Sequence, residues 1–244
     1  MLKMRTILLK FAGPLQSWGT SSHFESRHTD FYPSKSGVVG LIAACLGYRR
    51  DEDDKIRSLN DLHFAVRVDQ PGRLLKDYQT VHKLKKNGDF DRNYVTNRYY
   101  IEDGVFLVAL GSEKAGQIEE IVKALQQPYF QPFLGRRSVP PTYDFLLGVF
   151  DGSPLDLLKT YSWQKNKSHF VKSPTFLPIY FDVALGEGVG GRMRKDEAVS
   201  FSSRNRSYLF REENRLEILL PKEEADTEDD HDAFRAIGGE NVPF

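Results

Sequence analysis

Four short apolar segments in residues 1–150, separated by two helical patterns, limit this chain to very few folds. Residues 4–11 contain a central apolar run and predict a buried strand, and residues 104–110 are a more apolar strand. Residues 62–69 alternate apolar and polar positions, which predicts a half-buried strand, and residues 143–150 form a fourth short apolar segment. We therefore expect four strands in this part of the chain.

Two segments between these strands have the pattern of helices. Residues 34–47 contain Ser34 and Ser36, either of which can cap the start of a helix, and they end at Gly47. They are apolar around most of the helix. Residues 113–127 repeat apolar side chains at helical spacing on one face and stop before Pro128. The resulting order, β-α-β-β-α-β, predicts an α+β, ferredoxin-like domain over residues 1–150, in which an antiparallel sheet carries both helices on one face.

The connection between the second and third predicted strands, residues 70–103, is much longer than the hairpin turn this order needs. Unstructured connections of this length are uncommon and usually functional. From Arg73 to Arg98 the segment contains seven basic residues and three acids, interleaved with tyrosines, and Asn87-Gly88 is a turn signal. We predict a protruding basic hairpin with its tip near 85–89, suited to RNA, although an ordinary solvated insertion has the same composition.

Residues 132–141, PFLGRRSVPP, predict a stiff loop that presents two arginines. Prolines fix the backbone on both sides, and Gly135 allows a partner to approach the backbone closely. Arg136 and Arg137 carry planar sets of donors that suit phosphate groups. A fixed anion site is one interpretation, and a surface turn with two solvated arginines is the other.

Composition narrows the class of protein. The 244 residues are 40% apolar, enough for a substantial core, and the single Cys45 excludes an intramolecular disulfide and any multi-cysteine metal site. No apolar run is long enough to span a membrane, and the N-terminal apolar stretch is broken by Lys10 and Pro14, which argues against a signal peptide. We expect a cytoplasmic protein without cofactor or metal.

The formal net charge of zero hides a basic body. Residues 223–232 contain seven acids and no Lys or Arg, whereas residues 1–222 contain 33 Lys and Arg against 26 Asp and Glu, a net charge of +7. A basic body favours polyanionic partners. We expect residues 223–244 to be an acidic, disordered tail, and its rarer alternative role is to occupy the basic groove when the partner is absent.

Residues 151–222 carry a weaker signal. Residues 176–183 and 216–220 predict strands, and the glycines between Gly186 and Gly191 match no phosphate-binding spacing. We expect a smaller β-rich region here, separate from the domain at 1–150.

Ordered sequence blocks over roughly residues 5–150 carry a family resemblance. These blocks are GPLQSWG (13–19), Arg27-x-Thr29, YPSKSGVVGLIAACLG (32–47), DYQTV (77–81), Arg98-x-Tyr100 with Asp103, and FLGRRSVPP (133–141). Together they resemble the CasD family, the fifth CRISPR-associated family and a subunit family of type I-E CRISPR Cascade, in the RAMP superfamily of RNA-recognition-like folds. The resemblance weakens over residues 151–244.

The resemblance implies a crRNA-binding role without catalysis. Members of the family hold the 5′ handle of the crRNA and cap one end of the Cascade spiral in antiviral defence. Their implied partners are the CasC-type backbone subunit and the CasA-type large subunit, with target DNA near the complex and no membrane. A long thumb hairpin is expected between the second and third strands, where residues 70–103 lie. Target sequence is then read by base pairing with the guide RNA.

The candidate RNA-binding residues come from four of these segments. Side chains that follow the first strand can read or stack on bases, the start of the first helix offers amides and a dipole to phosphate, and the hairpin and the stiff loop add cations. For Trp18 a core position is the alternative, and for the helix start plain capping is. The candidates are Gln16, Ser17, Trp18, Arg27, Thr29, Lys35, Ser36, Gly37, Thr80, His82, Lys83, Arg98, Gly135, Arg136 and Arg137.

Two other functions stay open. Some relatives in subtype I-C cut CRISPR precursor RNA without a metal, using the 2′-OH of the RNA, and Tyr48, Tyr78, His82 and Lys83 are the side chains available here for such a reaction. A ferredoxin-like interaction domain without nucleic acid is the third hypothesis, and salt-dependent RNA retention would exclude it.

Overall fold

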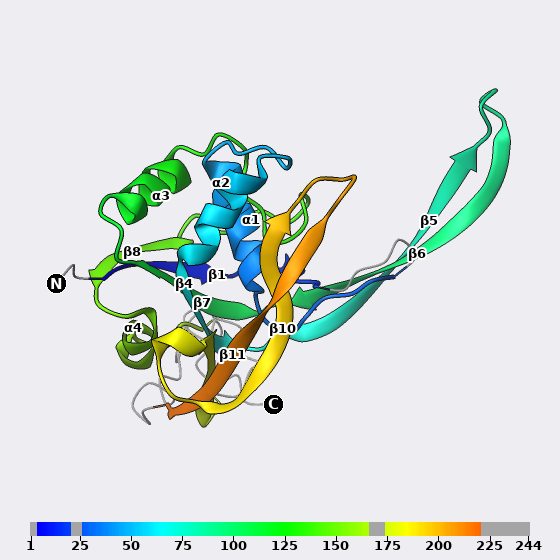
Figure 1. Cartoon of the computed structure of the whole chain (residues 1–244). Coiled ribbons are helices and arrows are strands. Elements are labelled where there is room, and N and C mark those ends of the chain that lie inside the picture. The colour runs from blue at the N-terminus through cyan, green and yellow to red at the C-terminus, as the bar shows by residue number, and fades with distance from the viewer. Residues whose placement is uncertain (1–3, 21–25, 166–173, 221–244) are drawn as a thin grey trace, which may run out of the picture.

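A seven-stranded sheet forms the centre of the molecule (Figure 1). The structure is a computed structural model that describes residues 4–20, 26–165 and 174–220. The strand order is β10-β11-β9-β4-β7-β1-β8, and each pair of neighbours is antiparallel. The acidic segment 223–244, for which the sequence predicts a disordered tail, lies outside the described residues. The fold is therefore mixed α+β and mostly antiparallel.

The six predicted elements of residues 4–150 are confirmed. They are β1 (Arg5–Phe11), α1 (Lys35–Cys45), β4 (His63–Gln70), β7 (Val105–Ser112), α3 (Gln117–Gln126) and β8 (Leu146–Asp151). In the sheet the four strands lie in the order β4-β7-β1-β8. Each helix therefore connects two strands that are separated in the sheet by the strand between them.

The sheet buries both of its faces. Ile7, Leu9 and Phe11 of β1 point to the face covered by α1 and α3, whereas Leu8 points to the other face. That second face is covered by α4 (Pro154–Thr160), a helix that the sequence analysis did not predict. Alternate residues of β1 thus enter two separate cores, which explains why Ile7, Leu8 and Leu9 are apolar in succession.

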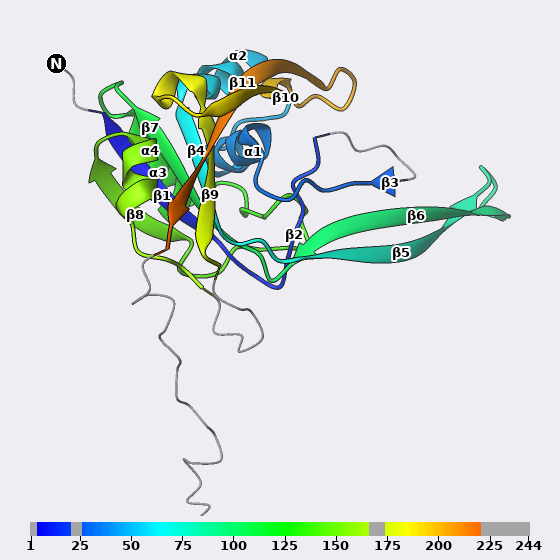
Figure 2. The same ribbon diagram turned by 90° about the horizontal axis from the view of Figure 1, so that it is seen from below.

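Strands β5 (Arg73–Leu84) and β6 (Phe90–Glu102) form one long hairpin that leaves the body of the molecule (Figures 1 and 2). Its tip closes with hydrogen bonds from Lys85 N to Asp89 O (2.7 Å) and from Gly88 N to Lys85 O (3.0 Å), which confirms the predicted turn. At the base, β6 also pairs with β2 (Leu15–Gln16) and, in parallel, with β3 (Ser26–Arg27).

Residues 174–220 extend the central sheet. The predicted strand 176–183 is confirmed as β9 (Phe176–Asp182), and the predicted 216–220 is the end of a much longer strand, β11 (Ser207–Leu219). Strand β10 (Val189–Ser200) was not predicted. Its inward positions are partly charged, with Arg194 and Asp196 buried, so it lacks the apolar alternation that marks a strand.

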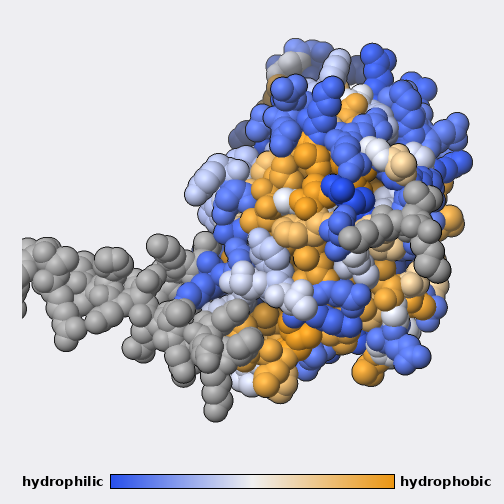
Figure 3. All heavy atoms as spheres, turned by 90° about the vertical axis from the view of Figure 1, so that its left-hand side faces the viewer, coloured by the Kyte–Doolittle hydropathy of each residue, from blue (hydrophilic) through white to orange (hydrophobic). Residues whose placement is uncertain are grey.

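Short elements complete the described chain. A helix α2 (Asp53–Ser58) and a 3-10 turn η1 (Leu59–Asp61) connect α1 to β4, and a second 3-10 turn η2 (Val183–Leu185) follows β9. Strand β8 forms one edge of the sheet and its apolar residues are only half-buried. Figure 3 shows apolar side chains gathered on the side of the molecule where β8, α3 and α4 lie, bordered by hydrophilic ones.

Candidate nucleic-acid interface

The loop after α3 is locked against the chain that follows β1. Leu134 N donates to Val139 O (2.8 Å), and Val139 N donates to Arg136 O (2.9 Å), so the loop folds into a tight turn. Ser17 N donates to Leu134 O (3.1 Å) and fixes the turn to its neighbour. Gly135 has a φ of +85°, and a Cβ on it would overlap the carbonyl oxygen of Ser17. Glycine is therefore required at this position both for its backbone angle and for the close approach.

Arg136 is held by contacts with the protein at the edge of a groove. Its Nη2 donates to two backbone carbonyls, those of Arg27 and Tyr99, both at 3.0 Å. Its guanidinium lies over the ring of Tyr100, with 4.1 Å between the guanidinium carbon and the ring centroid. Its Nη1 is buried and has no hydrogen-bond partner among the described residues. The neighbouring Arg137 is exposed. The loop thus carries one arginine fixed by protein contacts and one exposed arginine.

A groove of about 950 Å³ begins at these two arginines and runs along α1. Its floor is the face of α1 from Ser36 to Ala44, where the residues are mostly small. Phe130 and Phe133 of the loop form one wall, and the connection between β10 and β11 forms another. The volume lies within the range of ligand sites in proteins.

The charges lining the groove are all of one sign. Six arginines and a histidine line it, and none of its described lining residues is Asp or Glu. The arginines are Arg27, Arg49, Arg50, Arg136, Arg137 and Arg206, and the histidine is His28. Cations that lack carboxylate partners favour a polyanion, and the aromatic side chains beside them provide surfaces for nucleobases.

Eight of the fifteen candidate residues line this groove, namely Ser17, Trp18, Arg27, Ser36, Gly37, Gly135, Arg136 and Arg137. Their exposure differs. Trp18 is only 1% exposed and stacks on Phe11, with ring centroids 5.3 Å apart, so its core alternative describes it. Gln16 is fully buried, and its Nε2 donates to the carbonyls of Phe11 (3.2 Å) and Gly104 (2.8 Å). These two side chains support the groove from behind.

Lys35 is placed differently from the expectation that it helps bind phosphate. Its Nζ pairs with Asp182 (2.8 Å), and its backbone N–H donates to Asp196 (2.9 Å). Ser34 caps α1 by accepting from Gly37 N (3.2 Å). The start of the helix therefore already has a carboxylate and a hydroxyl as acceptors, which the sequence concealed because both aspartates lie more than 140 residues later.

That carboxylate belongs to a buried ionic network between α1 and the strands β9, β10 and β11. Arg211 pairs with Asp182 (2.9 Å), Asp196 (2.7 Å) and Glu213 (2.6 Å), and these surroundings hold the pKa of its guanidinium above the usual value although burial opposes this. Arg194 extends the network to Asp30 (2.9 Å). The network fixes the helix floor of the groove to the wall that β10 and β11 carry.

Two further candidates hold the chain at the base of the hairpin. Trp18 N donates to Thr29 Oγ1 (2.9 Å), which positions the segment containing Arg27 and His28. His28 stacks on Tyr99, with ring centroids 5.1 Å apart. Arg27 lies in β3 beside Arg98 of β6, whose Nε is buried without a hydrogen-bond partner among the described residues. Arginine donors that protein groups do not use thus occur on both β6 and the loop.

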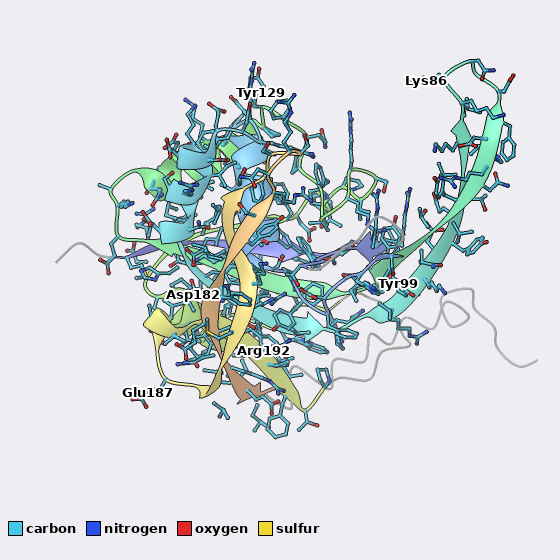
Figure 4. All side chains as sticks on the ribbon, turned by 45° about the vertical axis from the view of Figure 1, so that its right-hand side comes forward. Lys86, Tyr99, Tyr129, Asp182, Glu187 and Arg192 are labelled. Atoms are coloured by element: carbon cyan, nitrogen blue, oxygen red, sulfur yellow. The ribbon has the colours of Figure 1, made fainter. Side chains whose placement is uncertain are left out.

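The hairpin candidates lie on opposite faces. Because side chains alternate along a strand, Thr80 and His82 share one face of β5, and Lys83 lies on the other face, together with Arg92 and Arg98 of β6. The first face is otherwise uncharged near the tip and carries exposed apolar residues, among them Tyr78, Leu84, Phe90 and Val95. Figure 4 shows how far the tip, at Lys86, lies from the base, at Tyr99.

Sequence reasoning missed part of the groove. Arg49 and Arg50 follow α1, and Phe201, Arg206 and Tyr208 lie at the β10–β11 connection. The adjacent arginines were a usable signal, like Arg136-Arg137. The three other residues had no local signal, because only the pairing of β10 with β11 brings them to the helix.

Comparison with known proteins assigns the chain to a family. The sequence matches the family described as "CRISPR-associated protein (Cas_Cas5)" over residues 6–215. The chain belongs to this family. This family member is 35% identical over 161 residues to the "CRISPR system Cascade subunit CasD" of Escherichia coli (strain K12), a match that covers 60% of this chain and 72% of the relative. The resemblance predicted from the sequence blocks is thereby confirmed.

Two solved structures are similar to this family member. A chain of a "CRISPR RNA-guided surveillance complex" is 30% identical, with a TM-score of 0.74 over 88% of this chain and 91% of that one. A protein described as "Crystal structure of Cas protein" is 35% identical, with a TM-score of 0.62 over 90% and 97%.

The described residues hold no cluster of three or more His, Cys, Asp or Glu able to bind a metal ion. No helix within the described part of the chain is both long and apolar enough to cross a membrane.

Proposed function

We propose that this chain is a crRNA-binding subunit of a type I-E Cascade complex that holds the 5′ handle of the crRNA and does not cut it. The observation that carries the proposal is the groove along α1, which six arginines line without a carboxylate among its described lining residues. The family relationship and the likeness to a chain of an RNA-guided surveillance complex support the same assignment.

The arginines at this end of the groove suggest how the handle is gripped. Arg136 is held in a fixed orientation by two carbonyls and the Tyr100 ring, and it lines the groove. Arg137 adds an exposed cation beside it, and Arg27 adds another from β3. Charge-assisted bonds from such oriented donors are about twice as strong as neutral ones. Single-stranded RNA fits this site better than a duplex, since its bases are free to contact the aromatic walls.

We also propose that β1, α1, β4, β7, α3 and β8 form the ferredoxin-like RAMP domain at 1–150 and that the β5–β6 hairpin is its thumb. The antiparallel order β4-β7-β1-β8 and the position of the hairpin between β4 and β7 support both assignments. Residues 151–222 are then the smaller β-rich region, joined to the domain through the shared sheet. The thumb would extend over crRNA paired with target DNA, inside the cell.

The proposed partners follow from a capping position at the end of the Cascade spiral. A subunit that ends the spiral contacts the last CasC-type backbone subunit on one side and the CasA-type large subunit on the other. Near the tip of the hairpin, the exposed apolar residues on the face that carries Thr80 and His82 support a protein contact, because phosphate gains little from such a surface.

The alternative is a metal-independent endoribonuclease. Its four candidate side chains do not gather in one place: Tyr48 lies in the groove, Tyr78 and His82 share one hairpin face, and Lys83 lies on the opposite face. General acid–base catalysis needs its groups within hydrogen-bond reach of one reacting site.

The experiment is to incubate the purified full chain with labelled repeat RNA in the presence of EDTA and to record both binding and cleavage. We expect salt-dependent binding and intact RNA. A discrete cut with a 2′,3′-cyclic phosphate end would establish the nuclease instead. Arg137→Gln should weaken binding and lower its salt dependence, by about 0.7 in the slope of log K against log salt for each lost phosphate contact. Arg192→Gln, on β10 and outside the groove, is the matched control.

A further inference from the structure

The groove has a second cationic end that the proposed handle grip does not use. Opposite the Arg136 end, at the C-terminal end of α1, the chain continues into Tyr48, Arg49 and Arg50. Arg206 and Tyr208 approach the same place from the connection between β10 and β11. Residues from two elements 150 positions apart thus meet at one end of the groove.

The aromatic part of this end is fixed in place by α1. Phe201 lies against Gly40 of α1, where an added Cβ would be 3.6 Å from the Phe201 ring. Phe201 and Tyr208 are neighbours, with ring centroids 6.3 Å apart and a tilt of 56°. Both rings are only half-buried, so they present apolar surface to the groove.

The cationic part of this end consists of Arg50 and Arg206. Arg50 and Arg206 are exposed, and neither forms an ion pair with a described residue. Burial raises the pKa of the Tyr208 phenol, and the positive charges of Arg206 and Arg50 oppose this rise, so both guanidinium groups lie close enough to Tyr208 to act on it. Arg49 differs, because its backbone N–H donates to Glu52 (2.6 Å), whose carboxylate lies nearby. Two exposed arginines that form no ion pair among the described residues, beside an aromatic pair, are suited to a phosphate with its base.

We propose that Arg50, Arg206, Tyr208 and Phe201 form a second nucleotide subsite, which binds one phosphate and one unstacked base of the same single-stranded RNA that the Arg136 end grips. This inference rests on the proposed function, because the RNA is the ligand there. The helix floor from Ser36 to Ala44 joins the two ends over about 12 Å, given the rise of about 1.5 Å per residue. A single strand passing along α1 reaches both ends without leaving the groove.

The subsite makes two separate demands on the ligand. The guanidinium groups select an anion, and their contribution falls as salt rises. The rings select a base that is free to stack, and their contribution depends little on salt. Removing an arginine and removing the ring therefore have different signatures.

The test measures binding of the full chain to a fluorescently labelled single-stranded RNA across a salt series, with DNA of the same sequence in parallel. Arg50→Gln and Arg206→Gln are each expected to lower the slope of log K against log salt by about 0.7, which amounts to about a fourfold loss of affinity at 0.15 M salt. Tyr208→Leu is expected to lose affinity by about fivefold or more with the slope unchanged. Arg192→Gln removes the same charge outside the groove and is expected to change neither quantity.

The outcomes separate this subsite from the proposed function. If Arg137→Gln weakens binding while Arg50→Gln and Arg206→Gln behave like Arg192→Gln, the handle grip stands and the second subsite is wrong. If the unmodified chain does not bind RNA, both are wrong. Binding of DNA as tight as that of RNA would overturn the assignment to RNA. Thermal melting of each variant identifies a loss caused by misfolding, and both arginines are exposed, so their variants are expected to melt like the unmodified chain.

Discussion

Replacing Gly135 by alanine tests the geometry on which the candidate interface depends. Gly135 has a φ of +85°, which an L-residue adopts only at a cost of about 1–2 kcal/mol. A Cβ there would also overlap the carbonyl oxygen of Ser17, a backbone atom that cannot rotate away. The substitution must therefore separate the loop from the chain after β1.

The expected loss of stability has two parts. The backbone angle costs about 1–2 kcal/mol, and separation of the two segments breaks the hydrogen bond from Ser17 N to Leu134 O, worth about 1 kcal/mol. Together they lower the free energy of unfolding by about 2–3 kcal/mol. For a chain of this size that corresponds to a fall in Tm of about 4–12 °C.

The same shift reaches the RNA site. Arg136 follows Gly135 directly, and its contacts with the carbonyls of Arg27 and Tyr99 depend on the position of the loop. Gly135→Ala should therefore weaken RNA binding as well as stability. The assay is thermal unfolding followed by circular dichroism, with RNA binding measured by anisotropy well below Tm.

Gly116→Ala is the matched control. Gly116 has a φ of +79° but no atom within 4 Å of an added Cβ, so alanine there pays for the backbone angle without a clash. We expect a smaller fall in Tm and unchanged RNA affinity. If the two variants melt together and bind RNA equally well, the close approach of Gly135 to Ser17 does not hold the interface in place.

Three further changes probe other parts of the molecule. Arg211→Met leaves only Lys35 and Arg194 to balance the buried carboxylates of Asp182, Asp196 and Glu213, and it should cost about 3–5 kcal/mol in urea unfolding. A loss below about 1 kcal/mol would contradict the network. Burial raises the pKa of the Cys45 thiol to about 11, so the thiol should resist iodoacetamide at pH 8.5 until urea is added. Because the raised pKa belongs to the folded state, the free energy of unfolding should fall as pH rises from about 9 to 11. Rapid labelling of the folded protein would refute this assignment. Lys83→Gln with Arg92→Gln should weaken binding of target DNA by the assembled complex more than Thr80→Ala on the opposite face, and equal effects would show that the faces do not differ.

The central strands and helices could be read from the sequence because their burial follows their local pattern. Residues 104–110 are apolar throughout because β7 lies between β4 and β1 and is covered on both faces. The amphipathic face of 113–127 matched α3, whose Ile118, Ile121 and Leu125 are buried. The hairpin tip at Lys85–Asp89 was found because the turn residues and the flanking charges are local signals.

Strand β10 was missed because its core-facing side carries charge. Arg194 and Asp196 are buried only because Arg211 and Glu213 on β11 compensate them across the pair. A pattern that equates burial with apolar side chains cannot find such a strand. Lys35 was misplaced for a related reason, since its partner Asp182 is distant in sequence and adjacent in space.

The site shows the same division. The sequence by itself determined that Gly135, Arg136 and Arg137 form a stiff basic loop, because proline, glycine and arginine have fixed local properties. Only the tertiary structure showed that Arg136 Nη1 and Arg98 Nε have no hydrogen-bond partner among the described residues and that Trp18 is buried. It also showed that Arg206 and Tyr208 reach the C-terminal end of α1. The chemistry of a side chain determines which contacts a residue can make. Strand pairing across more than a hundred residues determines where in the molecule the residue makes them, and a single sequence contains no local record of that pairing.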